Sequence, residues 1–345
     1  METAFEREIR QQPDVIAGLV ARERGRVEAI AAEVRAARPR FALIAARGSS
    51  DNAARYAKYL FGVHHRLPVG LAAPALYTMY RTAPEVSDAL VIGVSQSGQS
   101  PDVVAVVADG TRQNALTIAL TNETDSPLAR AATLCLPLGA GEETAVAASK
   151  TYTAQLAALA MLSAAMSDGE ERWSELEKVA DAMRAALAAA DAARAGARRM
   201  AGAVRMAVLG RGFNFATAFE AALKLKETCY LAAEPYSWAD FLHGPIAMLD
   251  RLSPVLVVAP SGAASVDAAG IAATLAARGA PVAMVSDRED LLARADIALA
   301  VPAVPEWLSP LVAILPCQLL ALAVAEALGL DPDRPRGLAK VTRTT

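Results

Sequence analysis

The 345-residue sequence predicts an α/β protein with two tandem domains, each a parallel sheet flanked by helices in a flavodoxin- or Rossmann-like three-layer sandwich. Short apolar runs bounded by turn residues alternate with helical stretches along the chain. Runs of this kind are typical of strands that are buried on both faces of a parallel sheet. The same order of segments occurs twice, which indicates two copies of one domain.

The repeat is carried by three blocks of sequence at a constant offset of 164 residues, without gaps. Agreement of three blocks at one offset would be rare by chance, even in an alanine-rich chain. We therefore infer a first and a second copy of one fold. The paired blocks are Ala46–Gly48 with Gly210–Gly212, Val91–Gly98 with Val255–Gly262, and Leu128–Ala131 with Leu292–Ala295.

The elements follow in the same order in each copy. The first copy is expected to have strands at 41–44, 89–94 and 115–120, with a helix from about Asp51 to Leu60, and the second copy strands at 206–209, 254–259 and 281–285. Five parts are therefore predicted: a helical lead-in at 1–30, domain 1 at 31–167, a helical connector at 168–200, domain 2 at 201–330 and an irregular tail at 331–345.

Composition and charge exclude several classes of protein. Hydrophobic residues make up 54% of the chain, which is ample for a folded core. The net charge of −3 argues against a nucleic-acid binder, which usually needs a basic face. Three widely spaced cysteines, at 135, 229 and 317, fit neither a disulfide scaffold nor a CxxC metal site. The charged N-terminus lacks the apolar core of a signal peptide, so a cytoplasmic location is expected.

One uncharged stretch is long enough to be tested as a membrane span. It runs from Trp307 to Ala325 and is interrupted by Pro310, Pro316 and Gln318, and no second run accompanies it. We favour a buried or interface helix over a spanning one.

A serine-rich loop follows the second predicted strand of the first copy. It comprises Ser95, Gln96, Ser97, Gly98, Gln99 and Ser100, and the next helix would be capped by Ser100 and begin at Pro101. Backbone N–H groups at a helix start, together with hydroxyl and amide donors, form a typical site for a phosphate. No Walker lysine follows Gly98, so a nucleoside triphosphate is not expected. The alternative is an ordinary turn in which Asp102 satisfies the helix dipole.

The loop after the neighbouring strand could add two more hydroxyls, from Ser49 and Ser50, although both serines could equally serve as helix caps. In the second copy, Ala259 and Pro260 replace two of the side-chain donors, so only the first copy is expected to keep the full anion cradle.

The glycine pair at Gly210 and Gly212 matches the first two glycines of the fingerprint typical of dinucleotide-binding sites. The third glycine of that fingerprint is replaced by Phe215, so no nicotinamide cofactor is expected.

The second copy carries a candidate acid–base group. Glu220, Lys224 and Glu227 stand at i, i+4 and i+7 of a predicted helix, and His243 follows within a Leu-His-Gly-Pro motif. A solvent-facing ladder of ion pairs is the alternative for the first three, and a structural role is the alternative for the histidine, as for the pair at 64–65. Beside a sugar phosphate, these groups would suit proton transfer between adjacent carbons.

Together these residues resemble the sugar isomerase (SIS) family, and within it the isomerase half of glucosamine-6-phosphate synthases. The resemblance runs nearly end to end. Besides the serine loops it is carried by Glu8–Pro13, Val146–Lys150, Ala222–Glu227, His243–Pro245 and Pro335–Lys340. The serine loop alone would indicate only a sugar-phosphate SIS domain, whereas the Lys-Leu-Lys-Glu, His-Gly-Pro and Leu-Ala-Lys motifs together are more specific.

The resemblance implies two tandem SIS domains and a role for each motif. The substrate phosphate and nearby hydroxyls would be bound by the side chains of Ser49, Ser50, Ser95, Gln96, Ser97 and Ser100. Backbone groups of Val146 and Ala339 would line the sugar site.

The catalytic roles follow from the same resemblance. Glu227 would move a proton between C1 and C2, and Lys224 would assist near O1. His243, contributed by the neighbouring subunit of a homodimer, would open the sugar ring. Lys340 would contact the open-chain sugar and could form a Schiff base with the ketose. No metal and no cofactor are expected.

The sequence departs from the synthases at its start. It begins Met1-Glu2-Thr3, and about 30 residues of lead-in leave no room for their glutaminase domain. The expected reaction is therefore the reverse one, from glucosamine 6-phosphate to fructose 6-phosphate and ammonia, as in the SIS-fold glucosamine-6-phosphate deaminases. Ser100 keeps the hydroxyl of the synthase threonine, while nothing explains Gln99 in place of a glutamate.

Two alternatives stay open. One is another SIS-fold isomerase or deglycase acting on fructosamine or galactosamine phosphates. The other is a non-catalytic sensor of sugar phosphates, against which the retention of Glu227, His243 and Lys340 weighs. In every case the expected partner is a small sugar phosphate, with no nucleic acid and no membrane.

Overall fold

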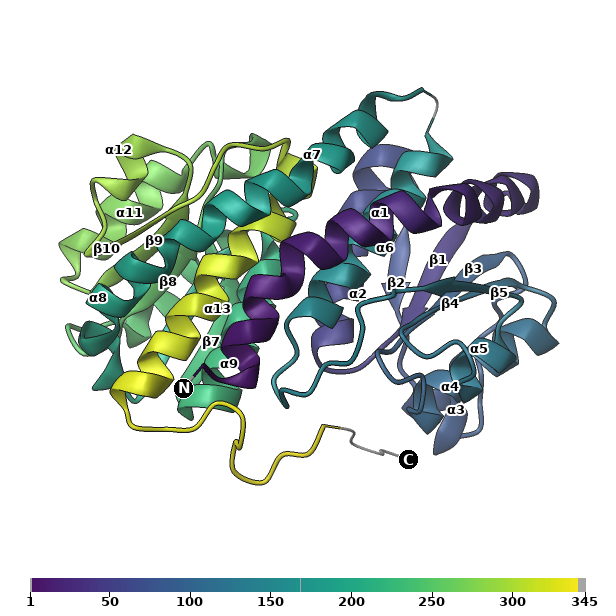
Figure 1. The fold of residues 1–345 in the computed structure, drawn as a ribbon, viewed down its shortest axis with the longest axis horizontal. Coiled ribbons are helices and arrows are strands. Elements are labelled where there is room, and N and C mark those ends of the chain that lie inside the picture. The colour runs from purple at the N-terminus through teal and green to yellow at the C-terminus, as the bar shows by residue number, and fades with distance from the viewer. Residues whose placement is uncertain (1, 168, 341–345) are drawn as a thin grey trace. The chain divides into compact units, whose positions relative to one another are not determined.

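The computed structural model describes residues 2–167 and 169–340, in two compact units that we describe separately (Figure 1). The first-copy unit comprises Asp14–Glu143, Lys150–Glu177 and the described end of the chain from Ala339. The second-copy unit comprises residues up to Pro13, the short segment Thr144–Ser149, and Lys178–Leu338. The units therefore exchange segments: both the start of the chain and a six-residue segment from its middle belong to the second-copy unit.

The first-copy unit is built on a parallel sheet of five strands in the order β2-β1-β3-β4-β5. Leu43 in β1 lies opposite Gly70 on one side and Val91 on the other. The three predicted strands are confirmed to within one residue. The strands are β1 (Phe41–Ala45), β2 (Val69–Leu71), β3 (Ala89–Val94), β4 (Leu116–Thr121) and β5 (Leu134–Pro137).

The second-copy unit repeats this topology, with the strand order β10-β9-β8-β6-β7. If β6 is counted as the first strand, the order is again 2-1-3-4-5, so the repeat in the sequence is a repeat of the whole fold. The strands are β6 (Arg205–Gly210), β7 (Ala232–Ser237), β8 (Val255–Val258), β9 (Val282–Ser286) and β10 (Ile297–Ala300). Only the edge strands of both sheets were missed by the sequence analysis.

Helices cover both faces of the first-copy sheet (Figure 1). On one face, Val103 and Val107 pack with Leu128 against Ala89 and Val91. These residues belong to α4 (Pro101–Arg112), α5 (Pro127–Ala131) and β3, with α3 (Ala75–Thr78) at the margin. On the other face lie α2 (Ser49–His65) and α6 (Lys150–Met166), which pack against each other.

The second-copy sheet is covered in the same way. One face carries Trp238, Phe241 and Ile271 in a core with strand residues of β6, β8 and β9. The helices are α10 (Trp238–Leu242), α11 (Ala268–Ala277) and α12 (Glu289–Leu292) on that face, and α9 (Asn214–Cys229), α13 (Ser309–Ala327) and α8 (Ala190–Ala201) on the other. The connector also contains α7 (Glu171–Ala186) and a 3-10 turn, η1 (Leu187–Ala189).

Two helices bear on the sequence predictions. The segment Glu306–Ala327, which contains α13, is long and apolar enough to cross a membrane, but its apolar window is entirely buried within the protein. This agrees with the favoured interpretation of a buried helix. Helix α1 (Ala4–Ala37) extends past the predicted lead-in and contains Pro13, at which the two units divide.

Candidate functional site

The two predicted serine loops follow neighbouring strands of the first-copy sheet. After β1 the chain moves to β2 on one side, and after β2 it crosses to β3 on the other side of β1. Ligands of open α/β sheets bind at such a switch point, outside the carboxyl ends of the strands. The fold thus brings the loop at Gly48–Ser50 next to the loop at Ser95–Ser100.

The loop at Ser95–Ser100 is shaped by its own hydroxyls. Gly98 has a φ of +60°, and its N–H donates to Ser95 Oγ at 3.1 Å. The N–H of Gln99 donates to Ser97 Oγ at 3.3 Å. Ser100 is the N-cap of α4 and Pro101 its first residue, as predicted, but the Ser100 hydroxyl makes no capping bond. The prediction was therefore right in position and wrong about the bond.

The buried carboxylate of Asp102 has a cationic partner. Arg47, in the loop after β1, approaches it at 2.6 Å, and the N–H of Val103 donates to it at 2.8 Å. Asp102 lies in the first turn of α4, as the alternative of an ordinary turn expects, and it is also paired with a neighbouring positive charge. We assigned Arg47 no role from the sequence.

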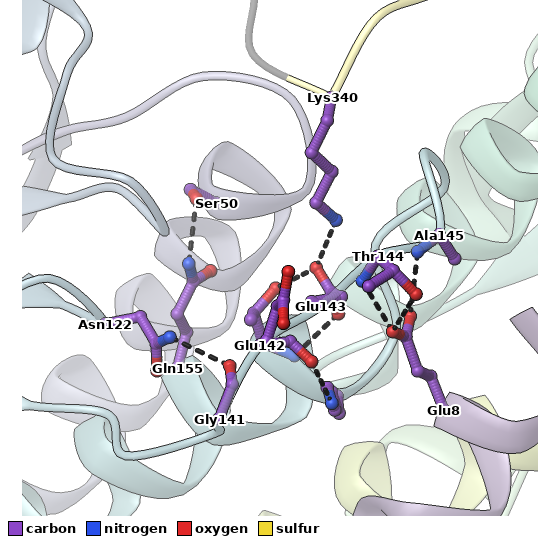
Figure 2. Close-up of polar contacts among 12 residues, drawn as sticks. Glu8, Ser50, Asn122, Gly141, Glu142, Glu143, Thr144, Ala145, Gln155 and Lys340 are labelled. Carbon is purple, nitrogen blue, oxygen red and sulfur yellow. Dashed lines mark hydrogen bonds and ion pairs between the residues drawn. The ribbon is translucent and has the colours of Figure 1, made fainter. Parts of the chain in front are cut away.

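The first turn of α2 holds two serines in different environments. Ser49 is partly exposed, whereas Ser50 is buried and accepts a hydrogen bond from Gln155 Nε2 of α6 at 2.9 Å (Figure 2). A hydroxyl that accepts this bond keeps its own proton to donate.

The equivalent loop of the second copy is filled by carboxylates of the chain itself. Glu306, which begins η4 (Glu306–Leu308), accepts from the N–H groups of Ala263 and Ala264 at 2.8 and 2.9 Å. The N–H of Ser261 donates to Asp287 at 2.6 Å. An internal carboxylate therefore lies at the second-copy counterpart of the loop that is predicted to bind a phosphate in the first copy.

The candidate acid–base group of α9 is largely buried. Lys224 Nζ lies 2.6 Å from Glu227 Oε2 and 3.3 Å from Glu220 Oε1. The side chains of Lys224 and Glu220 are fully buried, while that of Glu227 is 22% exposed. The alternative of a solvent-facing ladder is therefore wrong. Burying the charged side chains of Lys224 and Glu220 is costly and seldom improves stability, so such clusters are typical of functional sites.

His243 lies at the surface of the second-copy unit. It is the C-cap of α10 and is followed by Gly244 and the 3-10 turn η2 (Pro245–Met248). The residue is exposed, in contrast to the buried cluster of α9.

The tail lysine is held by a glutamate that we did not single out from the sequence. In the first-copy unit, Lys340 Nζ donates to Glu143 Oε2 at 2.6 Å (Figure 2). Glu143 is buried and also accepts from the N–H and the hydroxyl of Thr151, at 3.0 and 2.7 Å. The preceding residue, Ala339, is exposed.

A second glutamate missed by the sequence analysis fixes the segment that carries Val146. In the second-copy unit, buried Glu8 accepts from the N–H of Thr144 at 2.6 Å and from the N–H of Ala145 at 3.2 Å (Figure 2). Glu8 begins the Glu-Ile-Arg-Gln-Gln-Pro motif, so the motif itself was visible in the sequence but its contact was not.

The residues predicted from the sequence are divided between the units. The first-copy unit contains both serine loops, Ala339 and Lys340, and the second-copy unit contains Val146, Lys224, Glu227 and His243. Within each unit the structure adds partners, above all Arg47, Glu143, Glu8 and Glu220.

Comparison with known proteins agrees with this fold. The SIS domain model matches the chain twice, over residues 37–165 and 199–328. The isomerizing glutamine–fructose-6-phosphate aminotransferase of Brucella abortus is 35% identical over 352 residues, which cover 97% of this chain and 58% of that protein. The enzyme of the same name from Thermococcus kodakarensis is also 35% identical, over 97% and 57%. The chain therefore spans less than two thirds of these curated relatives.

Solved structures give the same result. A Silicibacter pomeroyi protein, provisionally classed as a phosphosugar isomerase, is 34% identical with a TM-score of 0.86 and covers 96% of this chain and 100% of that one. The glucosamine-6-phosphate deaminase of Thermotoga maritima has a TM-score of 0.80 over 99% of this chain and 100% of that one. At 21% identity, that likeness concerns the fold alone.

Proposed function

Since the chain belongs to the SIS domain family, we propose that it is an amino-sugar-phosphate deaminase that converts glucosamine 6-phosphate and water to fructose 6-phosphate and ammonia. The observation that carries the proposal is the buried contact of 2.6 Å between Lys224 and Glu227. A carboxylate that is partly open, beside a buried ammonium, is suited to take up and return a proton next to a carbonyl.

The chemistry of the side chains in this cluster gives each of them a step in the reaction. Once the ring is open, Glu227 takes the proton from C2 and returns it to C1. O1 gains a proton and the amine nitrogen loses one, so the 2-amino aldehyde becomes a 2-imino sugar with a hydroxyl on C1. The Lys224 ammonium stabilises the negative charge that develops on O1 between these transfers. Water then adds at C2, and ammonia leaves as the ketone forms.

The first copy would hold the other end of the substrate. Donors from the Ser95–Ser100 loop and from Ser49 and Ser50 would bind the phosphate, at the start of α2 and α4. Backbone groups of Val146 and Ala339 would line the sugar, and Lys340 would contact its open-chain form. Bound in this way, the substrate keeps its reacting carbons in one position during proton transfer.

The test is ammonia release from glucosamine 6-phosphate, measured beside galactosamine 6-phosphate and a fructosamine phosphate. The proposal expects release from glucosamine 6-phosphate. Release only from the other two would favour a deglycase or another isomerase of the same fold, and binding of all three without turnover would favour a sensor.

We further propose a homodimer in which His243 completes the partner's site, because this residue is exposed in its own unit. Mixing two inactive variants, Glu227→Gln and His243→Asn, tests this. Since random pairing gives half mixed dimers, each with one intact site, activity should return to about a quarter of the wild-type value. No recovery on mixing would mean that His243 serves its own chain or none.

A further inference from the structure

We propose that Glu143 is the positioning residue for the tail lysine, Lys340. The proposal deepens the proposed function, in which Lys340 contacts the open-chain sugar. Glu143 acts through the lysine and needs no contact with substrate.

The Glu143 carboxylate is itself held firmly. Its side chain is fully buried. Thr151, in the first turn of α6, donates its N–H to Oε1 at 3.0 Å and its hydroxyl to Oε2 at 2.7 Å. A carboxylate near a helix N-terminus also interacts favourably with the helix dipole. Oε2 therefore has one fixed position, to which Lys340 Nζ donates at 2.6 Å.

Lys340, in contrast, lies outside any regular element of the described chain. The described chain from Leu330 to Lys340 contains turns and irregular structure but no helix or strand. A lysine is a compact charge on a flexible four-carbon stem, and ordering it costs conformational entropy. A buried, already ordered carboxylate offsets that cost. A misplacement of about 1 Å can lower a rate on the order of 100-fold, so such an anchor matters for catalysis.

The neighbouring residue provides a matched control. Glu142 has the same side chain one position earlier, but it is exposed, and its backbone carbonyl accepts from Lys150 Nζ. Removing the charge at 142 should therefore leave the tail lysine where it is.

The test compares Glu143→Gln with Glu142→Gln. Glutamine keeps the shape of the side chain and can still accept from Thr151, but it lacks the charge that holds the ammonium. We expect Glu143→Gln to lower kcat on the order of 30-fold or more while KM changes less than about 3-fold, because the loss concerns positioning rather than binding. Glu142→Gln should stay within about 2-fold of wild type, and Glu143→Asp should recover part of the rate.

A double-mutant cycle separates this role from a purely structural one. If Glu143 acts through Lys340, Glu143→Gln should cost no more than about 2-fold in a Lys340→Ala background. Losses that multiply would mean that Glu143 supports the fold independently of the lysine, and the proposal would then be overturned.

A readout without substrate keeps this inference distinct from the proposed function. Trypsin must take the Lys340 side chain into its own acidic pocket, so cleavage after Lys340 requires the ion pair to open. Cleavage should be several-fold faster in Glu143→Gln than in wild type or Glu142→Gln, with circular dichroism confirming that each variant is folded. Equal cleavage rates would overturn the proposal. If Glu143→Gln is cleaved faster but the wild-type protein releases no ammonia from any sugar phosphate, the proposed function is refuted. The role of Glu143 in holding Lys340 is then still supported.

Discussion

Arg47 and Asp102 form an ion pair at 2.6 Å that joins the loop after β1 to the start of α4 at the switch point of the first-copy sheet. Arg47 follows β1, and Asp102 lies in the first turn of α4. The second copy repeats the contact between Arg211 and Asp267, at 2.7 Å. The two pairs differ in burial, since the Asp102 side chain is 1% exposed and that of Asp267 is 55% exposed.

This difference predicts unequal effects of the same substitution. Arg47→Ala leaves a buried carboxylate without its cation and should lower the free energy of unfolding by roughly 2–4 kcal/mol. Arg211→Ala removes an exposed pair and should cost less than about 1 kcal/mol. Urea unfolding of the two variants measures both values.

A second substitution tests the cause. Adding Asp102→Asn to Arg47→Ala removes the uncompensated charge and should recover part of the loss. If Arg47→Ala is no more costly than Arg211→Ala, or if the second change recovers nothing, burial of the carboxylate is not the reason.

Much of the fold could be predicted from the sequence because its determinants are local. The central strands are buried runs such as Ala89–Val94, and the helix after the serine loop begins at Pro101 as its capping pattern indicates. The edge strands were not predicted because their sequences have few of the features that are typical of strands. Strand β2 has three residues with a glycine at its centre, and β7 contains Pro235.

The site was less predictable, because burial and long-range contacts decide it. The i, i+4, i+7 spacing of Glu220, Lys224 and Glu227 fits a solvated face as well as a buried cluster, and only packing distinguishes them. The Glu143–Lys340 contact joins residues 197 positions apart. No pattern within a window of sequence predicts such a contact.

Glu227→Gln should abolish turnover while sparing ligand binding. The amide keeps the shape of the side chain but cannot take the C2 proton, and the predicted phosphate donors lie in the other copy. We expect kcat to fall on the order of 1,000-fold, within the usual range for loss of a general base, with an unchanged Kd for the sugar phosphate. Calorimetry and the ammonia assay measure the two quantities, and retained turnover would remove Glu227 from the role of base.

Glu306→Ala should destabilise the second copy. Its carboxylate accepts from the N–H groups of Ala263 and Ala264, which would lose their acceptor. We expect a loss of roughly 0.5–1.5 kcal/mol in the free energy of unfolding, the usual net value of a hydrogen bond, because the Ala264 contact is partly buried while water can replace the acceptor at exposed Ala263. Glu142, at the same offset in the first copy, is exposed, so Glu142→Ala is the control and should be nearly neutral. Equal losses in the two variants would contradict this account of the second loop.

The adjacent histidines of α2 predict a dependence of stability on pH. Ser163 Oγ lies 2.9 Å from both His64 Nδ1 and His65 Nε2, and a hydroxyl has one proton to donate. Each ring nitrogen can donate to the hydroxyl oxygen or accept its proton, so the two contacts fix the positions of the rings without fixing their tautomers. Burial, reinforced by the positive charges of Arg172 and His65, lowers the pKa of His64 from 6.5 to about 4. Burial and Arg172 also lower the pKa of His65.

The direction in which stability changes with pH follows from proton uptake by the two histidines. Well above pH 6.5 both rings are neutral in the folded and unfolded chain, so they add no pH dependence there. As the pH falls from 6.5 towards 4, the unfolded chain takes up protons that the folded rings resist, and the free energy of unfolding decreases. His64→Gln should therefore reduce the loss of stability between pH 7 and pH 5, measured by urea unfolding. A slope that is the same in wild type and His64→Gln would show that other groups cause it.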